Sequence, residues 1–357
     1  KWFPSSPAPG QGRRNQAMKY SIAIVSKNRH RILEESIRTL TAHLSLVKSY
    51  EIVVVEEAPV PQPIHWDPVR YHWIPERHFG LGFARDTALK RCRGDIVVFV
   101  DDDIRPHKNW FDNLVAPFQN DAVAGVGGAI IPDTRHINGV GKCISFLGFP
   151  AGGIRRWLTS GGQLRETTLI STGNCAFKRK FAERINGFDA LLRGCEDSDF
   201  FERLSKTGKT LFVPSAVVFH RQRGTYREVL QWFMKRGKNN FFYSCKEIGP
   251  AKALIFPLRS NFNIKLFFLA AVFLVVFHYS RILAPLLVAG CFGAWCLVIW
   301  RSQKEDLLGR IEDNDLKAIS DLTEEVRELY VPFHMGLVKF LMDLGFEIGR
   351  LAGFFVY

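Results

Sequence analysis

Three consecutive carboxylates are the strongest chemical signal in the sequence. In "VVFVDDDIRP" (97–106), four apolar residues lead directly into Asp101, Asp102 and Asp103. Like charges placed together resist ionising, so we expect a positive charge beside them. Carboxylate oxygens are preferred ligands of Mg²⁺ and Mn²⁺, and a cation held by few carboxylates usually bridges to substrate phosphates. The triplet therefore predicts a site for Mg²⁺ or Mn²⁺ at the end of a buried strand.

Two further groups have side chains that perform chemistry. "LLRGCEDSDFFERL" holds Glu196, Asp197 and Asp199 at the start of a helix, and "TLFVPSAVVFH" is an apolar strand that ends in His220. Carboxylates at a helix start either stabilise the helix dipole or include one that abstracts a proton. A histidine at a strand end is either structural or a metal ligand. The residues alone leave both alternatives open.

Alternating strands and helices have to position these groups. Apolar strands are expected at 21–26, 50–57 and 95–103, with helices between them at 31–44 and 82–92. Continuous Val and Ile runs between helices indicate a parallel sheet that is covered on both faces. Ligands bind such sheets at the carboxyl ends of the strands. Those ends are all polar here: Ser-Lys-Asn-Arg at 26–29, Glu-Glu at 56–57 and the Asp triplet.

These pieces, in this order, resemble family 2 of the nucleotide-sugar glycosyltransferases, which have the GT-A fold, over roughly 20–240. "VVFVDDDIRP" resembles the DxD strand of that family. "STGNCAFKRKFAERINGFDALLRGCEDSDFFERLSKTG" resembles its acceptor-side block, and "HFGLGFARDTALKRCRGD" is similar to its Gly-x-Gly-x-x-x-Ala-Arg-Asn segment. The resemblance implies an α/β fold of GT-A (Rossmann-like) type, with a mostly parallel sheet flanked by helices.

The resemblance also implies roles for individual residues. Asp101 and Asp103 would hold the divalent ion with the ribose and diphosphate, His220 would complete the metal site, and Asp197 would be the general base. The other implied contacts are nucleotide-binding residues Ser26, Arg29, Glu56, Glu57, Arg85, Asp101 and Asp102, and acceptor-side residues Gly173, Asn174, Glu196 and Asp199. The chain departs from the family at 56–59, where Asp-Asp-Gly-Ser is usual, and at Asp86, where Asn is usual.

The composition limits the class of protein. The 357 residues are 47% hydrophobic and 23% charged, which predicts a folded chain with a sizeable core. The seven cysteines form no CxxC pair, so we expect reduced thiols rather than a disulfide or zinc framework. Residues 1–17 lack apolar periodicity and any signal-peptide core, and are expected to be a leader or tag before Met18.

The positive charge is concentrated before an apolar region. The net charge is +13, and the segment 221–265 alone contains ten Lys or Arg and two Glu. Such a cluster indicates nucleic acid or an anionic membrane surface as partner. Residues 282–300 contain no charge, and 266–277 are apolar throughout, so the two predict a transmembrane hairpin. A buried helical pair in a soluble core is the alternative. Because the basic segment directly precedes this hairpin, its partner is expected to be a membrane surface rather than nucleic acid.

The positive-inside rule then orients the chain. Ten cations precede the hairpin and only Arg281 lies in its turn, so both ends of the hairpin are expected in the cytoplasm. After residue 301 the tail is polar, then apolar again from Val331, with charges on one helical face and Gly345, Gly349 and Gly353 on a neighbouring one. This pattern predicts an interfacial helix packed on the hairpin, since small residues allow close approach.

We therefore expect five segments: the leader (1–17), a GT-A catalytic domain (18–225), a basic interfacial collar (226–262), a transmembrane hairpin (263–300) and a polar then amphipathic C-terminal region (301–357). The predicted function is a membrane-anchored, metal-dependent, inverting glycosyltransferase. It would move a sugar from a UDP- or GDP-sugar to a hydroxyl of a lipid-linked or glycolipid acceptor, at the cell membrane with its catalytic domain in the cytoplasm. The alternatives are a polyprenyl-phosphate glycosyltransferase and a metal-dependent phosphohydrolase.

Overall fold

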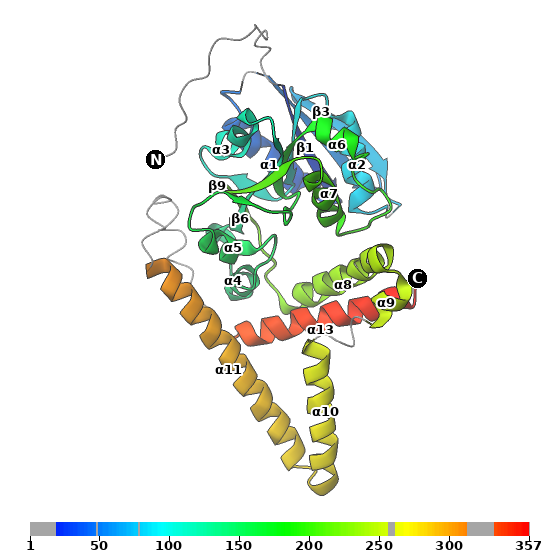
Figure 1. Cartoon of the computed structure of the whole chain (residues 1–357), viewed down its shortest axis with the longest axis vertical. Helices are drawn as coiled ribbons and strands as arrows, with labels where there is room; N and C mark the ends of the chain where they lie inside the picture. Colours follow the sequence, from blue (N-terminus) through cyan, green and yellow to red (C-terminus); the bar gives the residue numbers. More distant parts are fainter. Residues whose placement is uncertain (1–18, 48, 78, 256–260, 313–331, 357) are drawn as a thin grey trace.

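One mixed sheet forms the centre of the molecule (Figure 1). The computed structural model describes residues 19–47, 49–77, 79–255, 261–312 and 332–356, so the predicted leader lies outside the described residues. The sheet order is β3-β2-β1-β4-β8-β6-β9-β5, with β7 paired to β9. The strands are β1 (Tyr20–Lys27), β2 (Tyr50–Ala58), β3 (Val69–Pro75), β4 (Ile96–Asp101), β5 (Ile104–Pro106), β6 (Val123–Pro132), β7 (Arg165–Glu166), β8 (Asn174–Lys178) and β9 (Lys209–His220).

The sheet has a parallel half and an antiparallel insertion. Strands β3, β2, β1 and β4 are all parallel, as the Val and Ile runs predict. Strand β8 then lies antiparallel between β4 and β6, while β6 and β9 are parallel to each other. The predicted α/β sheet flanked by helices is confirmed, and its mixed character comes from β8, β5 and β7.

Helices cover both faces of the sheet because strand side chains alternate between two cores. In β1, Ile22 and Ile24 pack with α1 (His30–His43) and α3 (Trp110–Val115), whereas Ala23 faces the other core. The second core contains α2 (Leu81–Arg91), α6 (Arg179–Arg184) and α7 (Glu196–Ser205). A third apolar cluster joins β6 and β9 to α4 (Gly139–Phe146) and α5 (Gly153–Thr159). The short helix η1 (Ala116–Gln119) packs in the first core through Phe118, and the short helix η2 (Thr134–His136) follows β6.

Strand register brings the predicted polar ends together. Ser26 pairs with Glu56 and Lys27 with Glu57, while Val25 pairs with Asp101. The chain turns after Asp101 into β5, which pairs antiparallel with β9 so that Ile104 lies opposite His220. Asp103 therefore lies next to the strand end that carries the histidine, and its carbonyl accepts a hydrogen bond from the N–H of Arg221.

A long helix, α8 (Tyr226–Ile248), follows directly after β9. Its start is fixed by a capping box: Thr225 Oγ1 accepts from the N–H of Glu228, and the Glu228 carboxylate accepts from the N–H of Thr225. One ridge of α8 is buried at four-residue spacing: Val229, Phe233, Gly237, Phe241 and Cys245. The predicted collar is thus largely a structured helix with one buried face.

That buried ridge packs on α13 (Met335–Phe354), and Figure 1 shows the two helices side by side beneath the sheet. A side chain at Gly237 would collide with the carbonyl oxygen of Phe346, and one at Gly349 with that of Met234. The glycine spacing in the tail therefore does allow a close helix approach, but against α8 rather than mainly the hairpin. Gly336 of α13 lies against Cys296, so α13 contacts the hairpin as well.

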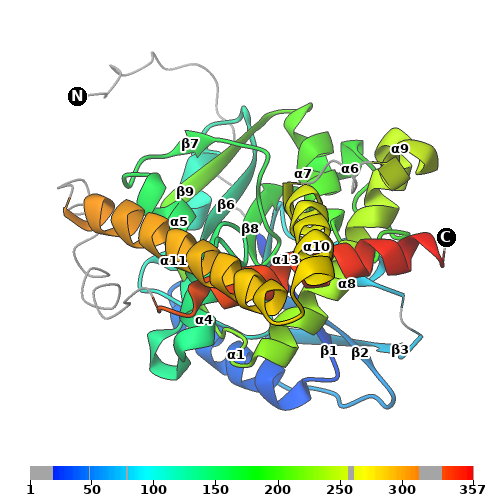
Figure 2. The same cartoon turned by 90° about the horizontal axis from the view of Figure 1, so that it is seen from below.

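The hairpin consists of α10 (Asn261–Tyr279) and α11 (Leu283–Glu312), with α9 (Pro250–Ile255) before it. Two stretches, Phe262–Tyr279 and Leu283–Glu305, are long and apolar enough to cross a membrane, and 0% and 6% of them is buried in the molecule. Figure 2 shows both helices on the side of α8 and α13 that is away from the sheet. Most of the predicted polar segment after 312 lies outside the described residues.

Candidate active site

A cavity of 1390 Å³ lies at the carboxyl ends of the parallel strands. One side is formed by the ends of β1, β2, β4 and β9 and by the start of α7. The other side is formed by α8, with Phe346 of α13. The sheet edge therefore supplies carboxylates to this space, and α8 supplies cations.

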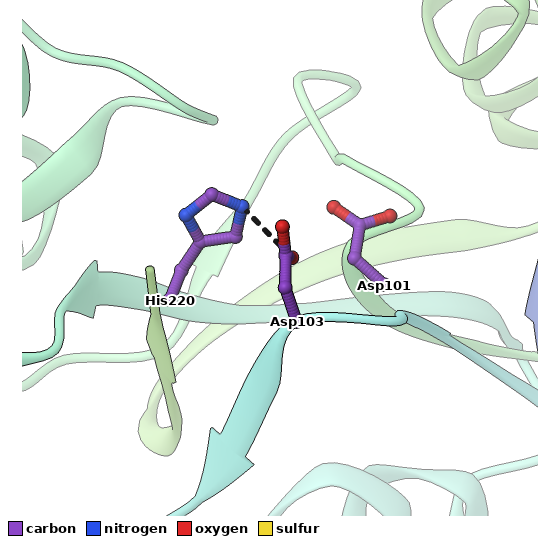
Figure 3. A group of neighbouring side chains, drawn as sticks. All are labelled: Asp101, Asp103 and His220. Atoms are coloured by element: carbon purple, nitrogen blue, oxygen red, sulfur yellow. Dashed lines mark ion pairs between the residues drawn. The ribbon is translucent and has the colours of Figure 1, made fainter. Parts of the chain in front are cut away.

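Asp101, Asp103 and His220 form the cluster that we call the Asp–His cluster (Figure 3). Each residue offers one ligand atom, and these atoms all lie within 4.8 Å of one another. His220 Nε2 lies 3.2 Å from Asp103 Oδ1, while His220 Nδ1 and Asp103 Oδ1 have no hydrogen-bond partner among the described residues. Gly173 backs the cluster, since a side chain there would meet Asp101 Oδ2 at 2.6 Å. Two carboxylates and an imidazole fit a divalent cation.

The middle residue of the triplet has a different environment. Asp102 is fully buried, accepts a 2.6 Å hydrogen bond from Ser26 Oγ, and pairs with Arg29 at 2.5 Å. Burial raises the pKa of Asp102 to about 7, although the charge of Arg29 opposes the rise. Arg29 also pairs with Asp103 at 2.7 Å. Arg29 therefore supplies part of the positive charge that the triplet requires, and Ser26 and Asp102 hold the turn in place.

Asp103 remains anionic for a different reason. Burial raises its pKa, but His220 and Arg29 together lower it by more, so the pKa of Asp103 lies below its usual range. The ionised form of Asp103 is the state that a metal ion requires of a carboxylate ligand.

Arg85 connects the two predicted groups of carboxylates. This buried guanidinium forms an ion pair with Glu196 and lies 3.5 Å from Asp101 Oδ1. Glu196 is itself 2% exposed, and its second oxygen has no hydrogen-bond partner among the described residues. The nucleotide-binding role implied for Arg85 and the acceptor-side role implied for Glu196 remain predictions, because each side chain is already engaged with the other.

The start of α7 separates the remaining two carboxylates. Asp199 is buried, with Arg203 and Lys246 each 2.5 Å from its oxygens, so it joins α7 to α8. Asp197 lines the cavity; one of its oxygens accepts from the N–H of Ser198 at 2.9 Å, and it forms no ion pair within the described residues. Of the three carboxylates at this helix start, Asp197 alone is both accessible from the cavity and without a cation partner in the described part of the chain.

Two predicted contacts, Glu56 and Asn174, do not line the cavity. Glu56 is 1% exposed and accepts from Tyr71 Oη at 2.8 Å, with His30 Nδ1 at 2.9 Å, so it lies behind the cavity, whereas Glu57 lines it. Asn174 is equally buried: its amide donates to the carbonyl oxygens of Ala129 and Ala216, and its oxygen accepts from Trp110. Asn174 therefore secures the junction of β8 with its neighbours and has no atom left for a ligand.

Sequence reasoning missed the cations of α8, and of the segment that leads into it, as cavity residues. Arg223, Lys235 and Arg236, which we call the cationic wall, line the cavity together with Trp232. The collar was expected to face lipid. The signal that distinguishes the two faces is helical spacing: 229, 233, 237 and 241 are apolar or small, whereas 232, 235, 236 and 239 lie along the flanking face, which is polar apart from Trp232.

Comparison with known proteins agrees with the geometry. Residues 21–185 match Glycosyl transferase family 2, and residues 159–228 match the N-terminal domain of galactosyltransferase. A pre-mycofactocin glycosyltransferase of Mycobacterium tuberculosis is 30% identical over 152 residues, which is 42% of this chain and 32% of that protein. A glucosyl-dolichyl phosphate glucuronosyltransferase of Haloferax volcanii is 30% identical over 131 residues, 34% of this chain and 38% of that protein.

The similarity is confined to part of those relatives, since the chain matches about a third of their length. Among solved structures, a mannosyltransferase from Pyrobaculum calidifontis in complex with GDP-Man and Mn²⁺ is 16% identical, with a TM-score of 0.49 over 98% of this chain and 90% of that one.

Proposed function

We propose that this chain, whose residues 21–185 match Glycosyl transferase family 2, is a metal-dependent, inverting glycosyltransferase. It would move a sugar from a nucleotide-sugar to a hydroxyl of a lipid-linked acceptor. The observation that carries the proposal is the sharing of one cavity by the Asp–His cluster and Asp197. The first is a site for a diphosphate with its cation, and the second is an available base. The relative from Haloferax volcanii, named for a glucosyl-dolichyl phosphate acceptor, supports a lipid-linked acceptor.

The chain's own residues divide the work as follows. When bound, a divalent cation neutralises the negative charge that grows on the leaving nucleoside diphosphate. Asp101, Asp103 and His220 hold it, and Arg29 keeps the turn that carries Asp103 in position. Asp197 takes the proton of the attacking hydroxyl, which approaches the sugar from the side away from the diphosphate and so inverts the configuration.

A second candidate is transfer to a polyprenyl phosphate, and the cationic wall is the observation that favours it. A phosphate monoester is largely ionised at neutral pH, with a second pKa of about 6, so it needs no base. The unpaired Asp197 favours the hydroxyl as the nucleophile. A metal-dependent phosphohydrolase would use the same cluster but leaves Asp197 and the family 2 match without a role.

The hairpin supports a place at the membrane. Its helices are almost entirely unburied within the molecule, and apolar surface of that extent is stable in lipid. With the cations before it and only Arg281 in its turn, the proposed orientation places the catalytic domain and the C-terminus in the cytoplasm.

The experiment measures binding of UDP and GDP to the full chain in detergent, with Mn²⁺ and with EDTA. Mn²⁺ should strengthen binding of one nucleotide by at least about 10-fold, because a metal-phosphate contact contributes several kcal/mol. Asp103→Ala should abolish the effect of Mn²⁺, and Asp121→Ala, a carboxylate 83% exposed outside the cavity, should leave it intact. Equal binding in Mn²⁺ and EDTA would overturn the metal-dependent proposal.

A further inference from the structure

The cationic wall has a composition that the transfer of a sugar to a neutral acceptor does not require. Arg223, Lys235 and Arg236 all line the cavity, and none of them forms an ion pair with a carboxylate within the described residues. Lys238 of α8 also lines the cavity, whereas Lys246, further along the helix, is paired with Asp199 and Asp189. Three cations that line one cavity, none of them in ion-pair contact with a carboxylate of the described residues, indicate an anionic ligand.

Two of these cations are held in fixed positions. The guanidinium of Arg223 lies 3.8 Å from the centre of the Trp232 ring, and that of Arg236 lies 5.4 Å from the same ring and 5.1 Å from that of Phe149. Stacking on aromatic rings restrains the planar groups while their N–H donors stay available. Trp232 therefore restrains both Arg223 and Arg236, and a preorganised pair of guanidinium groups suits a phosphate group.

The charges around the pair place it between the donor and acceptor sides. Burial lowers the pKa of Arg223 to about 10, with Asp103 opposing that shift and Arg29 and Arg236 adding to it. Burial also lowers the pKa of Arg236, and Asp197 opposes that shift. Both groups keep their charge at neutral pH. Arg221, two residues before Arg223, donates from its N–H to the carbonyl oxygen of Asp103, and Asn239, about one turn after Arg236, donates to the carbonyl oxygen of Arg193. Arg223 therefore lies on the segment next to the Asp–His cluster, and Arg236 lies on the part of α8 that faces the loop leading to Asp197.

The position of α8 indicates where the anion comes from. The buried ridge of α8, next to the face that carries Lys235 and Arg236, packs on α13, and α13 in turn contacts α11 of the hairpin (Figures 1 and 2). The wall therefore lies on the part of the cavity that is nearest to the hairpin. A ligand that enters from a membrane surface brings its head group to this helix first.

We propose that Arg223 and Arg236 bind the phosphate of a phosphate-bearing lipid acceptor, and that Arg236 is the contact specific to the acceptor. The inference rests on the proposed function only in calling the lipid an acceptor. Phosphate binding by the pair needs neither a donor nor proton transfer. Arg223 lies on the segment that follows His220, whereas Arg236 lies on the part of α8 that contacts the loop leading to Asp197. The phosphate anchors the lipid so that the atom to be glycosylated reaches the base.

The test measures binding of geranylgeranyl phosphate and of geranylgeraniol to the full chain in detergent micelles, without added metal. Wild type should bind the phosphate at least about 10-fold more tightly than the alcohol, and Arg236→Gln should remove that preference, because a charged hydrogen bond to phosphate contributes on this scale. Arg227→Gln is the matched control: it removes the same charge from an exposed position of α8 that does not line the cavity. That variant should keep the preference.

Each result decides between sources of the anion. Equal losses in Arg236→Gln and Arg227→Gln would mean that the helix attracts anionic lipid only through its total charge, and would overturn the inference. If Arg236→Gln instead weakens UDP or GDP binding in Mn²⁺ and leaves geranylgeranyl phosphate unaffected, the group belongs to the donor site and the inference fails. Inorganic phosphate that binds as tightly as the lipid phosphate would exclude a lipid ligand. Failure of the proposed function would appear separately, as unaltered transfer by Asp197→Asn.

Discussion

Replacement of Arg85 by methionine tests whether this residue is a structural link between the two carboxylate groups. Arg85 is 8% exposed and forms the only ion pair of Glu196 within the described residues. Removal of one partner leaves Glu196 as a buried charge with one oxygen already lacking a hydrogen bond. Breaking a buried pair in this way costs about 3–5 kcal/mol, so Arg85→Met should lower the free energy of unfolding by that amount.

A double variant separates loss of the pair from loss of packing. Arg85→Met with Glu196→Gln removes both charges, and well-packed neutral replacements of buried pairs are often close to neutral. We therefore expect the double variant to recover at least about 2 kcal/mol relative to Arg85→Met. The assay is urea unfolding of the full chain in detergent, followed by circular dichroism. A loss below about 1 kcal/mol in Arg85→Met, combined with weaker nucleotide binding, would refute the structural link and restore the nucleotide-binding role.

Two further predictions concern the framework around the site. Gly349→Ala should lower the free energy of unfolding by about 1–3 kcal/mol, since its Cβ would collide with the carbonyl oxygen of Met234. Gly290→Ala, whose Cβ would have nothing within 4 Å, is the control and should not be destabilised. Equal melting temperatures for the two variants would contradict the close packing. Burial raises the pKa of Asp133, but Arg135 and Arg105 lower it more, to about 2, so its ionised form stabilises the fold at pH 7 by about 2 kcal/mol. Because a lowered carboxylate pKa gives stability above the unfolded pKa of about 3.9, Asp133→Asn should lose that amount at pH 7 and the difference should shrink as the pH falls from 5 towards 2; a pH-independent difference in unfolding free energy would contradict it.

The sequence predicts those parts of the site that depend on local order along the chain. Parallel strands end at one edge of a sheet, so the polar residues after β1, β2 and β4 were expected together, and register pairs Ser26 with Glu56 and Val25 with Asp101. The positions of Asp103 and His220 follow from the turn into β5. The metal ligands that the resemblance implied are thus brought together by the structure, although their function stays a prediction.

The parts that could not be predicted depend on contacts between distant segments. The side-chain amide of Asn174 is hydrogen-bonded to backbone carbonyl groups because β8 is inserted antiparallel into the sheet. No pattern in "NCAFK" reveals the direction of the strands beside β8. Asp199 is engaged because Lys246, 47 residues away, reaches it from α8. The spacing of the charges in the C-terminal helix predicts a shared face but not its burial: Arg350 is 3% exposed, since the glycine ridge of α13 draws this helix onto α8.

The most direct test of the central claim is single-turnover transfer by Asp197→Asn at saturating nucleotide-sugar. Asparagine keeps the shape of the side chain and removes its basic oxygen, so transfer to a lipid-linked hydroxyl acceptor should slow by about 10²–10⁴-fold. Ser198→Ala, the exposed neighbour that also lines the cavity, is the control and should stay within a few-fold of wild type. Nucleotide binding should be unchanged in both variants, because it rests on the Asp–His cluster. A loss below about 10-fold on a confirmed hydroxyl acceptor would contradict the role of Asp197 and favour transfer to a polyprenyl phosphate.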